Sequence, residues 1–237
     1  MKIISLIAPK TAGATILTSN LAITHQWRTP QQRVGLLQLT QFPDIHHYMG
    51  LARKRNFGDL ISFWKTSEWG ETLIEQIVET QGVEVIQAPA FSQWSDISPD
   101  FFTGFLTLLG KRYQTLYLDY NPHLPPQVLQ ILLPYISHNI CVLSMDPASF
   151  HNTKEFLEMS AELKEKSQII INQTKTAERS DIQRQFKNLQ IPLLGIIPIE
   201  TKSLWHQIYE GVPAVMQKRS KFAKRLEPII DQILKLQ

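Results

Sequence analysis

Short apolar runs alternate with helical patterns along the whole chain, and this alternation restricts the fold more than any other feature. Several runs, such as "RVGLLQL" at 33–39 and "QIIIN" at 168–172, are apolar on both strand faces. Strands of this kind are typical of a parallel sheet that helices cover on both sides. The alternation therefore predicts an α/β fold with a doubly wound, mostly parallel sheet flanked by helices, in a single domain over 1–237.

The same pattern predicts where the individual elements lie. Strands are expected at 2–8, 33–39, 83–89, 115–120, 139–145, 168–172 and 193–198. Helices are expected at 15–27, 57–80, 100–112, 126–136, 149–165, 178–189, 200–210 and 219–236. Ligands of such folds bind beyond the carboxyl ends of the strands, so we expect a site in the loops after Ala8, Leu39, Pro89, Asp119 and Asn172.

Composition excludes several classes of protein. The 24 basic and 21 acidic side chains leave a formal net charge of +3, which is too small to indicate nucleic-acid binding. No apolar stretch approaches the roughly 18 residues of a membrane span, and the N-terminal apolar run is too short for a signal peptide. We therefore expect a soluble, cytoplasmic protein. The single cysteine, Cys141, lies in an apolar run, which predicts a buried side chain and not a nucleophile.

The first strand, its loop and the next helix have the layout of a phosphate-binding loop, in "SLIAPKTAGATILTSNLAITH" at 5–25. A working loop of this kind needs glycines, because its backbone amides wrap closely around a phosphate. Here Gly13 is present, while Lys10, Thr11 and Ala12 occupy the positions before it. The stretch has the right place in the fold and an unfavourable composition for the chemistry.

This opening, together with later motifs, resembles the MinD/ParA family of deviant Walker P-loop ATPases. The family pattern K-G-G-V-G-K-T-T followed by N-L-A is similar to "IAPKTAGATILTSNLA" at 7–22. Further matches follow in the family's order along the chain: "VGLLQLTQFPDIHHYMGL" at 34–51, "NFGDLI" at 56–61, "VEVIQAPA" at 83–90, "TLYLDYNP" at 115–122, "IIINQ" at 169–173, "LLGIIPIE" at 193–200 and "EGVPAV" at 210–215. The step at 41–44 and "IQAPA" at 86–90 look most like the CpaE/TadZ branch, which is associated with Tad (Flp) pilus assembly and polar localisation.

The chain departs from the family where charge is needed. The Walker lysine corresponds to Ala14, and the family's signature lysine corresponds to Pro9. Gln38 and Thr40 stand where the family has two acidic residues, and neither can act as a carboxylate base at neutral pH. Because phosphoryl transfer depends on positioning and charge stabilisation, the resemblance implies a pseudo-ATPase without catalytic residues.

A weak or vestigial nucleotide site remains in this interpretation. Its ligand would be ATP or ADP with Mg²⁺, which the protein is not expected to require. The resemblance implies cofactor binding by Lys10, Gly13, Thr15, Asp119 and Asn172, with Thr15 and Asp119 as Mg²⁺ ligands. Three of these side chains also have a structural alternative: a helix N-cap for Thr15, and turn or capping roles at strand ends for Asp119 and Asn172.

Three other groups of residues have a functional and a structural interpretation. Asp44, His46 and His47 lack further metal ligands nearby in the sequence, so we expect surface histidines. The last helix, with an apolar stripe from Phe222 to Leu234, either packs on the sheet or contacts a membrane. The tryptophans of the segment 57–95 are either dimer-interface anchors or core residues: Trp64, Trp69 and Trp94.

These observations lead to one functional hypothesis and two rivals. The hypothesis is a catalytically degenerate MinD/ParA-like scaffold or localisation protein, cytoplasmic, polar or peripheral to the inner membrane. It would act as a homodimer, or as a heterodimer with an active relative, and bind pilus or polar assembly components. The rivals are a slow ATP-dependent dimerisation switch that uses Lys10, and a ParA-type positioning protein that binds nonspecific DNA; no specific nucleic acid is expected.

Overall fold

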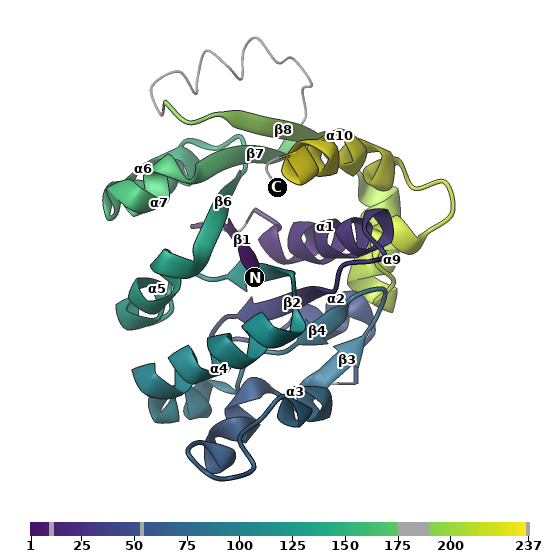
Figure 1. Ribbon diagram of the computed structural model, residues 1–237. Helices are drawn as coiled ribbons and strands as arrows, with labels where there is room; N and C mark the ends of the chain where they lie inside the picture. Colours follow the sequence, from purple (N-terminus) through teal and green to yellow (C-terminus); the bar gives the residue numbers. More distant parts are fainter. Residues whose placement is uncertain (10–11, 53–54, 175–189, 236–237) are drawn as a thin grey trace.

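One eight-stranded sheet forms the centre of the protein (Figure 1). The computed structural model describes residues 1–9, 12–52, 55–174 and 190–235. The strands are β1 (Lys2–Ile7), β2 (Val34–Leu39), β3 (Val78–Thr80), β4 (Glu84–Ile86), β5 (Thr115–Tyr120), β6 (Ile136–Leu143), β7 (Ser167–Thr174) and β8 (Leu193–Pro198). Their order is β3-β4-β2-β5-β1-β6-β7-β8, and every neighbouring pair is parallel except β3 and β4. The predicted α/β fold with a mostly parallel sheet is confirmed.

Helices cover both faces of the sheet (Figure 1). The α-helices are α1 (Ala14–Arg28), α2 (Ile45–Met49), α3 (Thr72–Ile77), α4 (Pro99–Arg112), α5 (Pro126–Leu132), α6 (Pro147–Glu158), α7 (Ala161–Glu165), α9 (Thr201–Glu210) and α10 (Lys221–Lys235). The 3₁₀ helices are η1 (Phe57–Phe63), η2 (Phe91–Asp96), η3 (Leu133–Tyr135) and η5 (Ala214–Met216). One apolar core lies between the sheet and α3 to α7, and a second lies between the sheet and α1, α2 and α10.

The expected helix at 57–80 is wrong over most of its length. The segment instead forms η1, then α3, then the antiparallel strand β3. Asn56 begins η1 with a capping box that includes Asp59, and Lys65 adopts a left-handed conformation (φ 63°) that a continuous helix does not allow. The sequence patterns did not predict the short helices α2 and η2 either.

The other expected elements lie close to the observed ones. The expected helix at 126–136 ends as the 3₁₀ turn η3, and the one at 149–165 divides where Ser160 caps α7. The expected strand at 83–89 shortens to β4. The expected helix at 178–189 lies outside the described residues.

The final helix packs on the sheet, in agreement with its structural interpretation. Its stripe of apolar side chains is buried against β8 and α1: Phe222, Leu226, Ile229, Ile230 and Ile233. In the described part of the chain, none of the helices combines the length and the apolar character that crossing a membrane requires. The apolar face of α10 that a membrane contact would use is therefore already covered by the protein.

Aromatic side chains from the segment 57–95 also belong to the core. Trp64, Trp69 and Trp94 are partly buried against the α4 side of the sheet, and Trp64 and Trp69 pack edge to face on Phe101. The tryptophans therefore have core positions, and the interpretation as exposed interface anchors is not supported. Cys141 is fully buried, as expected.

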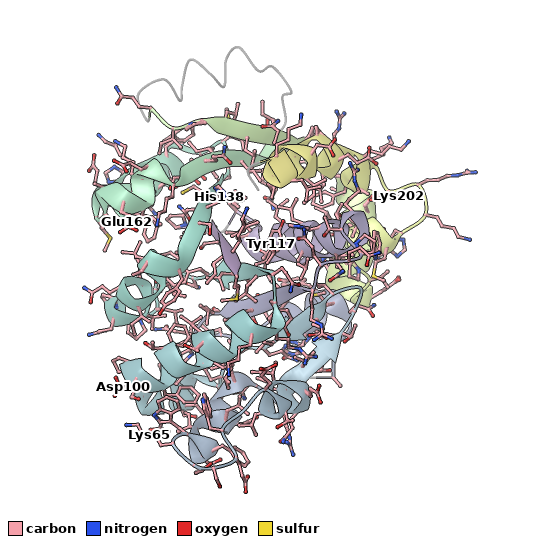
Figure 2. All side chains as sticks on the ribbon, viewed as in Figure 1. Lys65, Asp100, Tyr117, His138, Glu162 and Lys202 are labelled. Atoms are coloured by element: carbon pink, nitrogen blue, oxygen red, sulfur yellow. The ribbon has the colours of Figure 1, made fainter. Side chains whose placement is uncertain are left out.

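Two contacts tie separate elements together. Tyr117 lies inside the molecule (Figure 2), where its hydroxyl is 3.0 Å from Nδ1 of buried His25 on α1. The helices α2 and α9 end at left-handed glycines, Gly50 (φ 61°) and Gly211 (φ 68°), that lie against each other. A Cβ on Gly211 would lie 2.6 Å from the backbone nitrogen of Gly50, so only glycine allows this approach.

Candidate functional site

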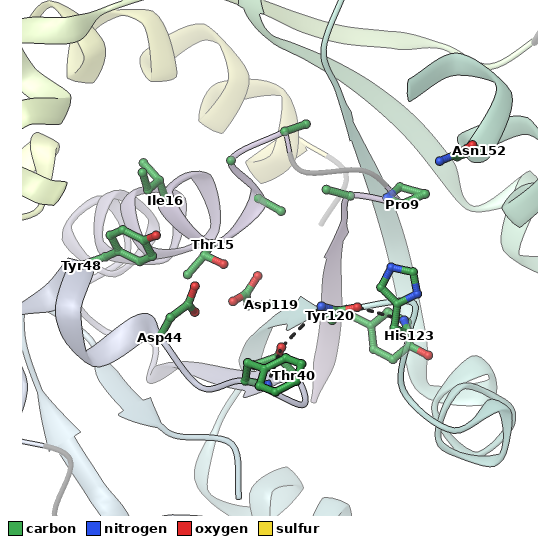
Figure 3. A pocket seen from close by; sticks show the side chains of 16 residues that line it. Pro9, Thr15, Ile16, Thr40, Asp44, Tyr48, Asp119, Tyr120, His123 and Asn152 are labelled. Atoms are coloured by element: carbon green, nitrogen blue, oxygen red, sulfur yellow. Dashed lines mark hydrogen bonds between the residues drawn. The ribbon is translucent and has the colours of Figure 1, made fainter. Parts of the chain in front are cut away.

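A pocket of about 510 Å³ opens at the carboxyl ends of β1, β2 and β5 (Figure 3). Residues of the loop after β1, of the first turn of α1 and of the loops after β2 and β5 line it. This is the edge of the sheet where the fold class predicted a site. Of the residues expected there, Gly13, Thr15 and Asp119 line the pocket together.

The loop enters α1 through a left-handed residue. Gly13 occupies the N-cap position with φ 79° and makes no side-chain cap, and the helix begins at Ala14. Thr15 is therefore the second residue of the helix, and the N-cap alternative for it is wrong. The first amides of a helix have no partner within it, so this end of α1 favours an anion.

Two carboxyl groups lie in the pocket, held together by an amide. Gln38 and Asp119 are paired in the register of β2 and β5. The Nε2 of Gln38 donates to Oδ1 of Asp44 at 2.7 Å and to Oδ2 of Asp119 at 3.1 Å. Thr15 also hydrogen-bonds Asp119, and in Figure 3 the side chains of Thr15, Asp44 and Asp119 point toward one another.

Burial perturbs both acids, and the negative charge of Asp44 perturbs Asp119 further. Burial, and then the negative charge of Asp44, raise the pKa of Asp119 to about 7, although hydrogen bonds from Gln38 and Thr15 act in the opposite direction. Burial likewise raises the pKa of Asp44. Asp119 therefore changes its charge near neutral pH, next to a second carboxyl group.

The described lining contains these two acids and no lysine or arginine. Oxygen ligands such as the Thr15 hydroxyl and the Asp119 carboxylate suit Mg²⁺. A triphosphate is not matched in the same way, because its charge would face two carboxyl groups without a described cation beside it. The described residues thus fit the metal and do not fit the nucleotide. Lys10, the cation expected here, lies outside the described residues.

Asn172 does not line the pocket with the other expected residues, and its side chain contacts the loop before α1. It is 3% exposed and lies near the end of β7, before Gln173 (φ 58°), where the pairing with β8 is irregular. Its Nδ2 donates to the carbonyl oxygen of Ala12 at 2.8 Å. A Cβ on Gly13 would lie only 2.8 Å from the same nitrogen. Asn172 therefore fixes the loop at the entrance to α1.

Sequence reasoning missed the contribution of Asp44, which it grouped with two histidines. Asp44 lines the pocket. His46 is buried at 8% exposed, so the expectation of surface histidines is wrong for His46 and correct for His47. Among the described residues, no group of three or more histidine, cysteine or acidic side chains could hold a metal ion. The position of Asp44 shortly after the end of β2, where the fold class places ligands, was the signal in the sequence that could have identified it.

An exposed aromatic pair lies at the rim of the pocket. Phe42, in the loop after β2, is 71% exposed and lines the pocket, and Phe91, at the start of η2, is 62% exposed. Their rings stack with centroids 5.8 Å apart and an angle of 2° between the planes. Large exposed apolar side chains in contact with each other are typical of binding surfaces.

The whole fold is similar to several solved structures. The ParA family ATPase from Chlorobium tepidum TLS matches with a TM-score of 0.82 and 17% identity over 98% of each chain. The cell division ATPase MinD from Pyrococcus furiosus matches with a TM-score of 0.79 and 19% identity, over 100% of this chain and 99% of that one. A chain of the MinC:MinD cell division protein complex from Aquifex aeolicus matches with a TM-score of 0.78 and 14% identity, over 99% of this chain and 96% of that one.

No protein-family model matches the sequence, and no curated protein does. The similarity to known proteins is therefore structural, and it extends over nearly the full length of each matched chain. The chain has the α/β fold of the MinD and ParA ATPases.

Proposed function

We propose that the protein is a catalytically degenerate MinD/ParA-like ATPase homologue that acts as a scaffold or localisation protein. The observation that carries this proposal is the charge of the pocket. Asp44 and Asp119 lie where the resemblance places a nucleotide, and Ala14 offers no charge at the lysine position. Phosphoryl transfer needs cations that stabilise the transferred group, and the described lining supplies none.

Calorimetric titration with Mg·ATP and Mg·ADP, with phosphate release measured on the same sample, tests this part of the proposal. We expect no turnover above the protein-free rate, and weak nucleotide binding or none. Binding without turnover agrees with a nucleotide that serves as a structural or dimerising ligand. Phosphate release in proportion to protein concentration would refute the pseudo-ATPase.

The rival ATPase switch depends on Lys10. Under this rival, Lys10→Ala abolishes turnover, while Lys154→Ala, which removes an exposed lysine on α6, leaves it unchanged. Equal phosphate release by the two variants excludes the Lys10 route.

The proposed mode of action is binding to other proteins, as a homodimer or as a heterodimer with an active relative. The exposed pair of Phe42 and Phe91 at the pocket rim supports a protein contact on this face. The resemblance of the 41–44 step to the CpaE/TadZ branch supports a role in Tad/Flp-type pilus assembly at a cell pole. Among the structural matches, MinD of Aquifex aeolicus is in a complex with MinC.

Sedimentation velocity tests the use of this face. We expect the wild-type protein to sediment as a dimer and the Phe42→Ala/Phe91→Ala variant to shift toward the monomer. Met159→Ala, which removes another exposed apolar side chain (68% exposed), is the control and should not change the sedimentation coefficient. A dimer that survives loss of both phenylalanines contradicts this assignment of the interface.

A further inference from the structure

Helix α9 directs polar side chains toward the protein. Ser203 is 6% exposed and Gln207 is fully buried. The Oε1 of Gln207 accepts from Nδ2 of Asn20 at 2.7 Å and from the backbone nitrogen of Ala214 at 3.0 Å, and its Nε2 donates to Oγ of Ser19 at 3.1 Å. This network fixes the rotation of the helix, because a buried polar group left without its partner costs about 1–3 kcal/mol.

Three large apolar side chains of α9 consequently face outward, whereas Leu204 packs against the core. Trp205, Ile208 and Tyr209, which we call the α9 ridge, are 56%, 43% and 67% exposed. The rings of Trp205 and Tyr209 pack together with centroids 4.0 Å apart. An amphipathic surface helix ordinarily has the opposite arrangement, with its apolar stripe toward the core. Tryptophan and tyrosine are also the residues that most often dominate binding energy at interfaces.

A recess of about 570 Å³ lies beside the ridge, between α9 and the segment 217–221. Four cations line it: Lys202, Lys218, Arg219 and Lys221. Lys202 lies at the outer edge of the molecule (Figure 2), and within the described residues none of the four forms an ion pair with a carboxylate. Glu200 and Glu210 also line the recess, and Glu210 is engaged by Nδ1 of His206 at 3.0 Å. The recess therefore presents an excess of positive charge.

We propose that the α9 ridge and this recess together bind a segment of a partner protein that carries carboxylates next to apolar side chains. The partner's apolar side chains cover Trp205 and Tyr209, and its carboxylates enter the recess and pair with the cations there. The two halves of the surface have complementary requirements, since one needs apolar area and the other needs negative charge. This surface shares no lining residue with the pocket, and its test uses protein without added nucleotide, so its outcome can be distinguished from that of the nucleotide titration.

The shape and charges of the surface favour a protein segment over two other anionic partners. A bilayer is flat and would contact the ridge without filling the recess. A nucleic acid carries a continuous row of phosphates, which Glu200 and Glu210 would repel. A peptide can place single carboxylates between these two acids and beside the cations.

Selection of random 12-residue peptides displayed on phage, with the full-length protein as bait, tests the proposal. We expect the recovered peptides to combine aspartate or glutamate with leucine, phenylalanine or tryptophan. A fluorescein-labelled copy of the best peptide, titrated by fluorescence polarisation, should lose about tenfold or more in affinity with Trp205→Ala/Tyr209→Ala. The same loss is expected with Lys218→Glu/Lys221→Glu. Because all four side chains are exposed, these variants should fold normally, which far-UV circular dichroism checks.

Matched control variants separate this surface from general effects of charge and aromatic content. Tyr135→Ala removes an exposed tyrosine at η3, and Lys154→Glu reverses an exposed cation on α6; neither should change peptide affinity. Peptides without acidic residues, or equal affinity in ridge, recess and control variants, would overturn the proposal. It is equally overturned if no peptide is recovered and the ridge variants instead lose binding to phosphatidylserine vesicles or to a DNA duplex.

Discussion

Replacing Asp119 with asparagine should make the protein more stable at neutral and alkaline pH. The buried carboxyl group has its pKa raised to about 7, so ionisation above that pH places a charge where burial and Asp44 oppose it. The asparagine that replaces it has the same shape and no charge. Its oxygen can accept from Gln38, and its amide can donate to the hydroxyl of Thr15, so both present hydrogen-bond partners are kept.

The magnitude follows from the difference between the folded and unfolded pKa of Asp119. In the unfolded chain the carboxyl group ionises near pH 4, and in the folded protein it ionises near pH 7. Between these values the folded state binds more protons than the unfolded state, so the wild-type free energy of unfolding falls as pH rises. The fall amounts to about 1.4 kcal/mol per pH unit and about 4 kcal/mol in total. Above pH 7 the difference between variant and wild type becomes constant.

Urea unfolding followed by far-UV circular dichroism at pH 5, 6, 7 and 8, with EDTA present, measures this difference. Titrating groups other than Asp119 and its neighbour Asp44 are common to both proteins and cancel in the comparison. We expect the advantage of Asp119→Asn over wild type to grow by about 3 kcal/mol between pH 5 and pH 8. A difference that does not change with pH would refute the argument that Asp119 is buried beside a second acid.

Three further predictions concern stability. Gly13→Ala should destabilise the protein by about 1–3 kcal/mol, because alanine is strained at φ 79° and its Cβ would lie 2.8 Å from the side-chain nitrogen of Asn172. The control Gly110→Ala on α4 should be neutral or stabilising, and equal effects of the two changes in urea unfolding would contradict the loop geometry. Burial lowers the pKa of His25 to about 4, so this side chain should contribute a loss of about 3 kcal/mol as pH falls from 6.5 to 4, opposite in sign to the contribution of Asp119. His25→Gln should remove only this contribution, so its free energy of unfolding relative to wild type should rise by about 3 kcal/mol over that range, and a constant difference would contradict the burial of His25. Leu226→Ala on α10 should lower the free energy of unfolding by about 2–5 kcal/mol, whereas Glu227→Ala, at the exposed neighbouring position, should change it little. If both variants unfold thermally like wild type, α10 does not pack on the sheet.

Most of the sheet could be predicted from the sequence, because its central strands are apolar on both faces and stand between clear helical patterns. The strand β3 could not be predicted. Its three residues follow Leu73, Ile74 and Ile77, whose spacing is typical of a helix, and β3 exists because it pairs with β4 after a turn. Such a short edge strand depends on tertiary pairing more than on local preference.

The candidate site was only partly predictable for a similar reason. Gly13, Thr15 and Asp119 stand at the ends of strands or the start of a helix, where a doubly wound fold places its ligands. The position of Asp44 depends on the side chain of Gln38, which sequence reasoning had treated only as a missing acid. Helix α9 was predicted at nearly the right position, but its inward polar face depends on Asn20, which lies 187 residues away along the chain. No local periodicity contains that information.

We predict that the contact between Gly50 and Gly211 couples the pocket to the α9 ridge thermodynamically. Asp44 immediately precedes α2, whose five residues end at Met49, and the next residue, Gly50, lies against Gly211, which directly follows α9. Under this prediction, a ligand that displaces Asp44 acts on α9 through one short helix and one backbone contact. Coupling between two binding sites is reciprocal, so a partner held on the ridge would change the affinity of the pocket by the same factor. Titrating the pocket with Mg²⁺ in the presence and absence of a ridge-bound peptide would measure that factor, and a value of one would mean that the two surfaces act separately.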